Sequence, residues 1–273
     1  MEYSVETMAL FGLAVLVAGV VAGLIAGLLG VGGGIVVVPV LFYLFTLMDV
    51  DPAVRMHMAV GTSLSTIIVT ALSSTRAHYR KQSIDTALLR SWGPWLLAGA
   101  VIGMLAFGSL DTTWLTVIFA SVALVVAIYM VFAPEPKGDS DQRFPKGFVR
   151  YVLGLVVGGI SSVMGIGGGT LSVPVLSLFR YPIRRAVGTA AAIGLLISVP
   201  GTVGAFVSGL GVENRPPFSL GYVNLLAFCV LVPVTAMVAP YGARLAHTIK
   251  PRSLRLAFAA FLLFNATNMF LSL

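Results

Sequence analysis

Long apolar stretches fill most of this 273-residue chain and restrict it to one class of protein. Each stretch lacks Lys, Arg, Asp and Glu and reaches or exceeds the roughly 18 to 20 residues that cross about 30 Å of hydrocarbon as a helix. Hydrophobic residues make up 58% of the chain and charged residues 10%, too little polar surface for a soluble domain. The sequence therefore predicts an all-α, polytopic integral membrane protein. The stretches are 7–48, 56–75, 91–110, 112–133, 151–179, 186–212, 216–243 and 256–273.

All but two of the 17 Lys and Arg residues lie in four groups between these stretches, and the exceptions are Arg55 and Arg215. Cytoplasmic loops of membrane proteins carry an excess of Lys and Arg, so we expect the four groups to face the cytoplasm. The net charge of +7 then needs no nucleic acid, and no nucleic-acid partner is expected. The groups are Arg76 to Arg90, Lys137 to Arg150, Arg180 to Arg185 and Arg244 to Arg255.

A glycine-rich motif occurs twice and interrupts two of the apolar stretches. It reads G-V-G-G-G-I-V-V-V-P-V-L from Gly30 to Leu41 and G-I-G-G-G-T-L-S-V-P-V-L from Gly165 to Leu176, in the same register. In membrane transporters, broken apolar segments at corresponding positions of two halves point to the binding site. We expect the substrate to bind where these two breaks lie.

The charges and the motif together predict two halves inserted in opposite directions. Stretches 7–48 and 151–179 must each enter the bilayer and return to the same side, turning at the glycines, and three ordinary crossings follow each hairpin. We therefore expect a helical bundle of two inverted-topology repeats, residues 1–133 and 148–273, joined by a cytoplasmic linker at 134–147. Both termini are then expected on the periplasmic side.

Further motifs extend the pattern and resemble a known family. A-V-G-T follows each glycine motif, at Ala59 to Thr62 and Ala186 to Thr189, and P-Y-G-A-R-L-A-H runs from Pro240 to His247. With the paired G-x-G-G-G-x4-P motifs and the run H-M-A-V-G-T-S-L from His57 to Leu64, the chain resembles the TauE/SafE family over nearly its whole length. The resemblance implies secondary transport, often outward, of sulfur-containing anions such as sulfite or sulfoacetate across the bacterial inner membrane.

The physical chemistry of the glycine motif points to an anion independently. Backbone N–H groups exposed to lipid cost several kcal/mol each, so those at a break must face protein, water or a ligand. A helix that starts at the break carries about half a positive charge there and presents free donors. The return helices could start at Gly34 and Gly169, or at Pro39 and Pro174. The candidate residues for binding a small anionic substrate are Gly30, Gly32, Gly33, Gly34, Gly165, Gly167, Gly168 and Gly169, with Thr62, Ser63 and Thr189 as hydroxyl donors.

Other interpretations of these residues stay open. The glycines could serve close helix packing alone, and Ser and Thr hydroxyls in membrane helices often bond to their own backbone. A passive anion channel is the alternative function. If the glycines form the substrate site, Gly33→Ala or Gly168→Ala should abolish transport while the melting temperature stays near that of the parent. His57 is a candidate for proton coupling, because it is titratable and lies near the start of a crossing.

Sequence signatures of enzymes and of resident cofactors are lacking. The chain has no G-x4-G-K-[ST] loop, no H-E-x-x-H sequence and no pair of intramembrane aspartates. Its single cysteine, Cys229, offers neither a disulfide nor a thiolate metal site. We therefore expect no enzyme, no cofactor and no bound metal. The expected partners are the small anion and the lipid bilayer, and the sequence gives no oligomeric state.

Overall fold

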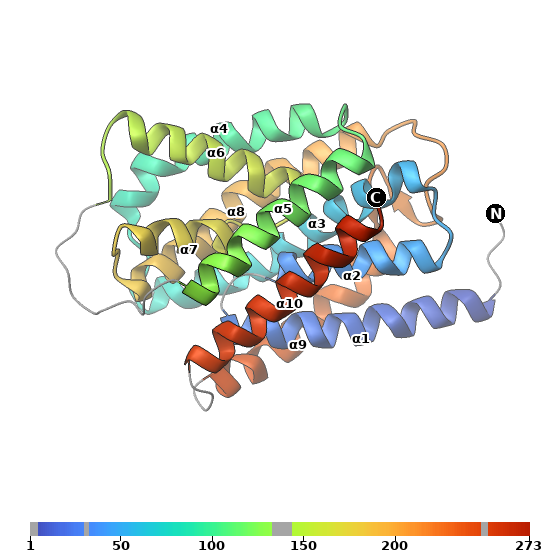
Figure 1. Ribbon diagram of the computed structural model, residues 1–273, viewed down its shortest axis with the longest axis horizontal. Helices are drawn as coiled ribbons and strands as arrows, with labels where there is room; N and C mark the ends of the chain where they lie inside the picture. The colour runs from blue at the N-terminus through green and yellow to red at the C-terminus, as the bar shows by residue number, and fades with distance from the viewer. Residues whose placement is uncertain (1–4, 30–32, 133–143, 247–250) are drawn as a thin grey trace.

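The computed structural model describes residues 5–29, 33–132, 144–246 and 251–273 (Figure 1). These residues form helices apart from one two-stranded hairpin and short connections, which confirms the predicted all-α polytopic class. Five helices are long and apolar enough to cross a membrane by length and composition, namely α3, α4, α5, α8 and the segment Leu225–Gly242 of α9. The elements are α1 (Val5–Leu29), α2 (Gly34–Leu47), α3 (Pro52–Arg80), α4 (Thr86–Phe107), α5 (Thr112–Phe132), α6 (Phe148–Val163), α7 (Gly169–Leu178), α8 (Ile183–Ser208), β1 (Ser219–Leu220), β2 (Val223–Asn224), α9 (Leu225–Ala246) and α10 (Pro251–Leu271).

Each half of the chain has the same order of helices. A first helix, α1 or α6, is followed by the shorter α2 or α7, and three longer helices come next. In Figure 1, α1 begins and α10 ends at one end of the molecule, whereas α5 ends and α6 begins at the other. The inverted relation of the halves and their boundaries at 133 and 148 stay predictions.

Packing between helices crosses from one half to the other. Helix α1 packs on α9 and α6 packs on α4, while α3 packs on α8 and α5 on α10. The short helices α2 and α7 pack on α3 and α8 of their own halves. If each helix is replaced by its counterpart in the other half, the pair α1–α9 becomes α6–α4 and the pair α2–α3 becomes α7–α8. The pairs α3–α8 and α5–α10 stay the same. The centre of the molecule is consequently built from both halves together.

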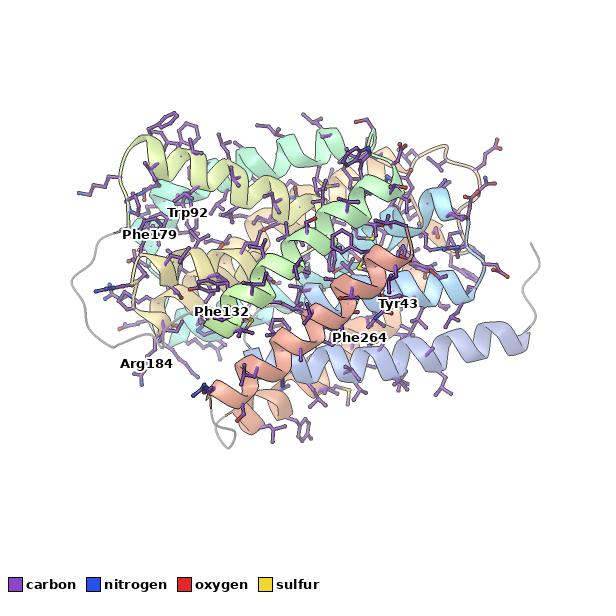
Figure 2. The ribbon with its side chains drawn as sticks, viewed as in Figure 1. Tyr43, Trp92, Phe132, Phe179, Arg184 and Phe264 are labelled. Atoms are coloured by element: carbon purple, nitrogen blue, oxygen red, sulfur yellow. The ribbon has the colours of Figure 1, made fainter. Side chains whose placement is uncertain are left out.

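Apolar side chains separate into a buried core and an outer surface. Trp92 on α4 and Phe179, after α7, belong to or pack against one buried cluster near the end where α6 begins (Figure 2). Phe132 and Phe264 are 79% and 65% exposed and project from α5 and α10. Exposed aromatic residues of this size on apolar helices are expected where lipid, not water, is the surrounding solvent.

The apolar stretch 216–243 was expected to cross the membrane as a helix, but its first residues, 216–224, are not helical. The strands β1 and β2 pair antiparallel around a turn at Gly221, where φ is 57°. Helix α9 begins only after this hairpin, because Asn224 places its Oδ1 2.8 Å from the backbone N–H of Ala227 and caps the first turn. Helix α4 begins in the same way, with the backbone N–H of Leu88 donating to Asp85 Oδ1 at 2.9 Å.

Candidate functional site

The two return helices start at glycine and not at proline. Helix α2 begins at Gly34, after Gly33 in the left-handed conformation with φ 74°. Helix α7 begins at Gly169. Pro39 and Pro174 lie inside these helices. Of the two pairs of starting residues that the sequence leaves open, the glycines are therefore the correct one. Gly30 and Gly32 lie outside the described residues.

The two glycine motifs meet at the centre of the molecule. A methyl group built on Gly34 would lie 2.9 Å from the carbonyl oxygen of Gly165 and 3.0 Å from Cα of Ile166. The Ser63 hydroxyl on α3 donates to the same Gly165 oxygen at 2.7 Å. Gly165 itself turns with φ 69°, and Gly168 has φ −50° where its counterpart Gly33 has φ 74°. The motif is repeated in sequence, but its two backbones are not identical.

Close packing explains in part why glycine occupies these positions of the second motif. A methyl group on Gly168 would lie 2.3 Å from Cγ2 and 3.0 Å from the carbonyl carbon of Ile193 on α8. One on Gly167 would lie 3.2 Å from Cγ2 of Ile67 on α3. The expectation that Gly168→Ala leaves the melting temperature unchanged does not fit this contact, since neither Ile193 nor the α8 backbone has room to move away freely.

The start of α7 also presents free donors. The N–H groups of Thr170 and Ser172 donate to the carbonyl oxygens of Gly167 and Gly168, at 3.2 and 2.8 Å. The N–H groups of Gly167, Gly168 and Gly169 donate no hydrogen bond within the described part of the chain. Three unpaired donors at a helix N-terminus form a site suited to negative charge.

Two hydroxyls beside these donors were missed in the sequence. Thr170 and Ser172 on α7 are 2% and 0% exposed, and their hydroxyls have no partner among the described residues. The first copy of the motif places Ile35 and Val37 at the matching positions, both buried. A comparison of the two copies could have revealed these hydroxyls, because only the second copy carries polar side chains at the two positions. Hydroxyl donors at these two positions therefore occur only on the second motif.

The hydroxyls of Thr62 and Thr189 each accept a hydrogen bond from a backbone N–H group of the opposite half. The Thr62 hydroxyl on α3 accepts a hydrogen bond from the N–H of Asn224 at 2.9 Å. The Thr189 hydroxyl on α8 accepts one from the N–H of Asp85, also at 2.9 Å. We call these contacts the Thr62 clamp and the Thr189 clamp. Each one fixes the residue that caps a long helix, α9 or α4, of the other half.

The glycine before each threonine lets the two backbones approach closely. A methyl group on Gly61 would lie 2.3 Å from the carbonyl oxygen of Tyr222, and one on Gly188 would lie 2.4 Å from that of Ser83. The repeated V-G-T sequence thus has one structural role at both positions. The clamps lie toward opposite ends of the molecule, because the hairpin before α9 and the start of α4 do so (Figure 1).

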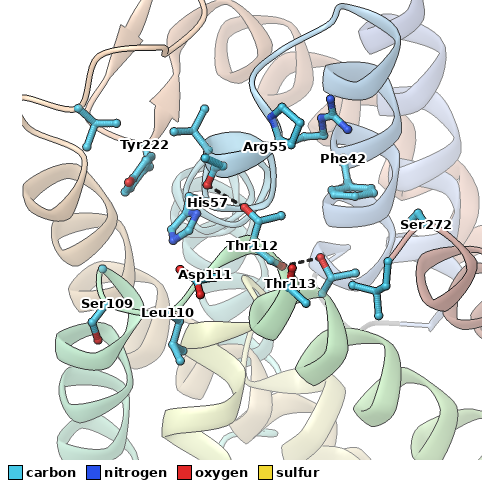
Figure 3. Close-up of a pocket in the computed structure, with 17 residues that line it drawn as sticks. Phe42, Arg55, His57, Ser109, Leu110, Asp111, Thr112, Thr113, Tyr222 and Ser272 are labelled. Atoms are coloured by element: carbon cyan, nitrogen blue, oxygen red, sulfur yellow. Dashed lines mark hydrogen bonds between the residues drawn. The ribbon is translucent and has the colours of Figure 1, made fainter.

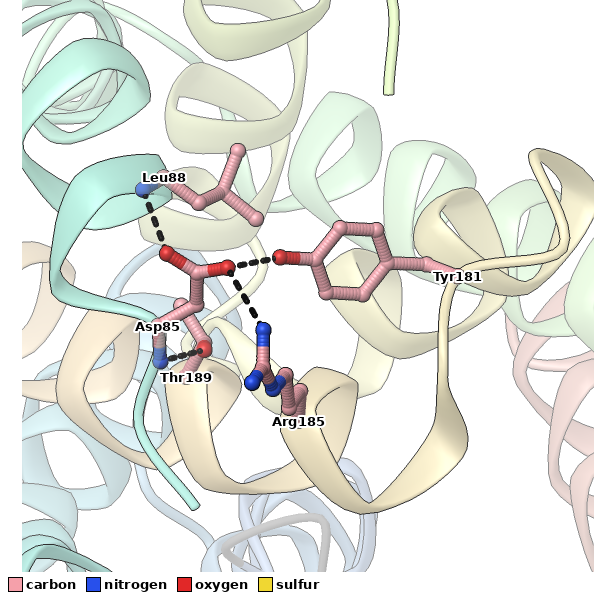
Figure 4. Close-up of polar contacts among 5 residues, drawn as sticks. All are labelled: Asp85, Leu88, Tyr181, Arg185 and Thr189. Atoms are coloured by element: carbon pink, nitrogen blue, oxygen red, sulfur yellow. Dashed lines mark hydrogen bonds and ion pairs between the residues drawn. The ribbon is translucent and has the colours of Figure 1, made fainter. Parts of the chain in front are cut away.

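The Thr189 clamp is reinforced by charge. Asp85 Oδ2 accepts a hydrogen bond from the Tyr181 hydroxyl and lies 3.8 Å from Nη1 of Arg185 (Figure 4). Burial acts to raise the pKa of Asp85, but the hydrogen bonds from Tyr181 and Leu88 and the charge of Arg185 together leave this pKa below its usual value. Burial and the neighbouring carboxylate raise the pKa of Tyr181 well above its usual value. A charged carboxylate and a neutral phenol therefore face each other.

A cavity of about 680 Å³ opens near the Thr62 clamp (Figure 3). The first turns of α3 and α5, the turn between α4 and α5, and Tyr222 line it. His57 lies at its wall, 4% exposed, stacked on Tyr222 with ring centroids 4.7 Å apart and against Phe107 at 4.9 Å. Arg55 and Asp111 are the charged side chains of the lining. No group of three or more His, Cys, Asp or Glu that could hold a metal occurs among the described residues.

Comparison with known proteins agrees with this architecture. The family model "Sulfite exporter TauE/SafE" matches residues 15–269. A "Probable membrane transporter protein" of Haemophilus influenzae is 34% identical over 97% of this chain and 100% of its own length. "Probable membrane transporter protein YunE" of Bacillus subtilis is 28% identical over 88% of this chain and 90% of its own. A counterpart in Methanocaldococcus jannaschii is 27% identical over 85% of both chains. No solved structure matches. The chain thus belongs to the TauE/SafE family of membrane transporters.

Proposed function

We propose that this protein is a secondary transporter that exports a small anion, a sulfur oxyanion or an organosulfonate, across the bacterial inner membrane by alternating access. The observation that carries the proposal is the start of α7, where three free N–H groups stand beside the unpartnered hydroxyls of Thr170 and Ser172. Neutral donors of this kind hold a monoanion without Lys or Arg. The family name, which refers to sulfite export, supports the substrate class and the direction.

The position of this site supports transport over simple binding. The contact between Gly34 and Gly165 places both motifs at the centre of the molecule, where helices of both halves meet. Substrate sites of transporters with inverted repeats lie at such a repeat interface near the middle of the bilayer. The crosswise packing of α1 on α9 and α6 on α4 is the arrangement that two inverted repeats would give.

The two clamps are the gates that alternating access requires. Each clamp joins the halves on one side of the glycine motifs, so separating the Thr62 clamp would open the centre to one end and separating the Thr189 clamp would open it to the other. The basic groups around Arg76 to Arg90 and Arg180 to Arg185 flank the Thr189 clamp. By the positive-inside rule that end faces the cytoplasm.

Counterflow in proteoliposomes tests the proposal. Unlabelled sulfoacetate trapped inside should drive labelled sulfoacetate inward against its gradient, and lactate or chloride inside should not. A passive anion channel would release the trapped anion without accumulating label. Failure of sulfite, thiosulfate and sulfoacetate to exchange in folded protein would contradict the proposal.

A further inference from the structure

The cavity near the Thr62 clamp, which we call the His57 cavity, gathers groups that attract an anion. The first turns of α3 and α5 both line it, and the first turn of α5 directs a helix N-terminus to this space. In α5 the N–H of Leu115 donates to the Asp111 carbonyl oxygen, while those of Thr113 and Trp114 donate no hydrogen bond within the described residues. The cavity volume suits a small organic ligand.

Arg55 adds a full positive charge to this lining. Its Nε and Nη2 donate to the Val50 carbonyl oxygen at 3.2 and 2.8 Å, which fixes the guanidinium plane. Nη1 makes no hydrogen bond among the described residues. A positioned guanidinium with a free N–H group is the residue type best suited to an oxyanion.

His57 supplies a buried ring nitrogen without a hydrogen-bond partner among the described residues. Its side chain is 4% exposed and its Nδ1 has no hydrogen-bond partner among the described residues, although it lies in the cavity wall (Figure 3). A buried polar atom without a partner is uncommon and calls for a ligand or a proton. The charged and titratable groups around it are Arg55 on its own helix, Asp111 from the turn before α5, Tyr222 from the hairpin, and Arg215, which donates to the Gly221 carbonyl oxygen.

We propose that the His57 cavity is a second anion site, separate from the glycine motifs, which binds a small sulfonate or carboxylate together with a proton on His57. The bound oxyanion contacts Arg55 and the first turn of α5, and the protonated imidazole offsets the charge of Asp111. Because His57 stacks on Tyr222, whose carbonyl oxygen touches Gly61, the ligand lies against the Thr62 clamp. The site itself does not depend on the proposed function, which is needed only to identify its ligand with the transported anion.

A cysteine reporter in the cavity tests this site without reference to transport. Ser109 lines the cavity and becomes Ser109→Cys in a Cys229→Ala background, where an uncharged methanethiosulfonate reagent labels it. Methanesulfonate is the competing probe, because its charge is constant over the pH range used. The half-protecting concentration is measured and not the labelling rate, since the thiolate fraction itself rises with pH. Glu213→Cys, exposed and outside the lining, is the matched reporter that methanesulfonate should not protect.

Methanesulfonate should protect Ser109→Cys at low pH and lose about tenfold in affinity per pH unit above the pH at which His57 loses its proton. His57→Gln should remove this pH dependence. Asp111→Asn should tighten protection by about twofold to tenfold, because it removes a negative charge from the lining. Asp49→Asn, at an exposed aspartate outside the lining, should change nothing.

Two results would overturn the second site. One is the absence of protection of Ser109→Cys at every pH. The other is protection that does not depend on pH and is unchanged in Asp111→Asn, a variant at an exposed turn that keeps the test valid if His57→Gln fails to fold. Either result together with normal sulfoacetate counterflow would reject the His57 cavity and leave the transport proposal standing. Normal protection with no counterflow would reject the transport proposal alone.

Discussion

Thr170 distinguishes a substrate site from a structural one at the level of a single side chain. Its buried hydroxyl has no partner in the described chain, so it contributes nothing evident to stability. Removing an unpaired buried hydroxyl with an isosteric methyl group should leave the free energy of unfolding unchanged or slightly higher. We expect Thr170→Val and Ser172→Ala each to weaken sulfoacetate binding by about 0.5 to 3 kcal/mol, with no loss of melting temperature.

Thermal stabilisation by sulfoacetate measures this change in binding. Thr235→Val is the control, because Thr235 is buried on α9 and its hydroxyl is already bonded to the Leu231 carbonyl oxygen at 2.6 Å. It should keep normal sulfoacetate binding. Unchanged binding in both α7 variants would show that the hydroxyls on the second motif do not hold the anion.

Gly168 is expected to behave as a packing residue whatever else it does. Because an added methyl group meets Ile193, Gly168→Ala should lower stability by about 1 to 3 kcal/mol, which a melting curve detects. On α1, an added methyl group at Gly12 would meet no other helix among the described residues, so Gly12→Ala should be neutral or stabilising. Equal melting temperatures for the two variants would contradict the contact with Ile193.

The clamps predict effects that are local to one element each. Thr62→Val leaves the N–H of Asn224 without its acceptor, at a cost of about 1 to 3 kcal/mol in the stability of that contact. Amide hydrogen exchange should then accelerate in residues 219–227 and stay unchanged in 83–89, and Thr189→Val should do the reverse. Thr62→Ser and Thr189→Ser, which keep the hydroxyl, are the controls. Acceleration of both segments by either variant would contradict two separate clamps.

The loss of protein stability at acidic pH should depend on Tyr181. With a lowered pKa, the Asp85 carboxylate contributes stability that is fully present above the usual aspartate pKa of about 3.9 and is lost as the pH falls through the lowered value. Tyr181→Phe removes one cause of the lowering, so the loss should be smaller and should be complete at a higher pH than in the parent. Melting temperature measured against pH tests this, with exposed Tyr79→Phe as the control. Superimposable profiles for the two variants would contradict it.

The elements were predictable from sequence to different degrees. The two glycine breaks were expected because three consecutive glycines interrupt apolar stretches, a purely local signal. The hairpin before α9 was missed, since strands of two residues leave no periodic pattern and residues 216–224 contain no Lys, Arg, Asp or Glu to interrupt the apolar stretch. Thr62 and Thr189 were singled out from sequence as hydroxyl donors to the substrate, and their partners Asn224 and Asp85, from the other half of the chain, were not foreseen. No local pattern reveals such a contact.

At the scale of the whole molecule, the charge distribution predicts how the chain lies in the membrane. We expect the linker 134–147 on the basic, cytoplasmic side, so Ser140→Cys in a Cys229→Ala background should resist a membrane-impermeant thiol reagent in intact cells and react after permeabilisation. Glu213→Cys, in the loop at the opposite end, should react in intact cells. Labelling of Ser140→Cys from outside would contradict the inverted-repeat arrangement.

The pairing of α1 with α9 has a consequence for the biogenesis of the protein. The partner of α1 is synthesised about 200 residues after it. At roughly 5 to 20 residues per second, ribosomes take about 10 to 40 seconds to make that length of chain. During this interval α1 has no α9 to pack against. The helix pairs between the two halves therefore form late, after most of the chain has been translated. An N-terminal fragment ending after α5 should be degraded in cells unless the second half is supplied in trans.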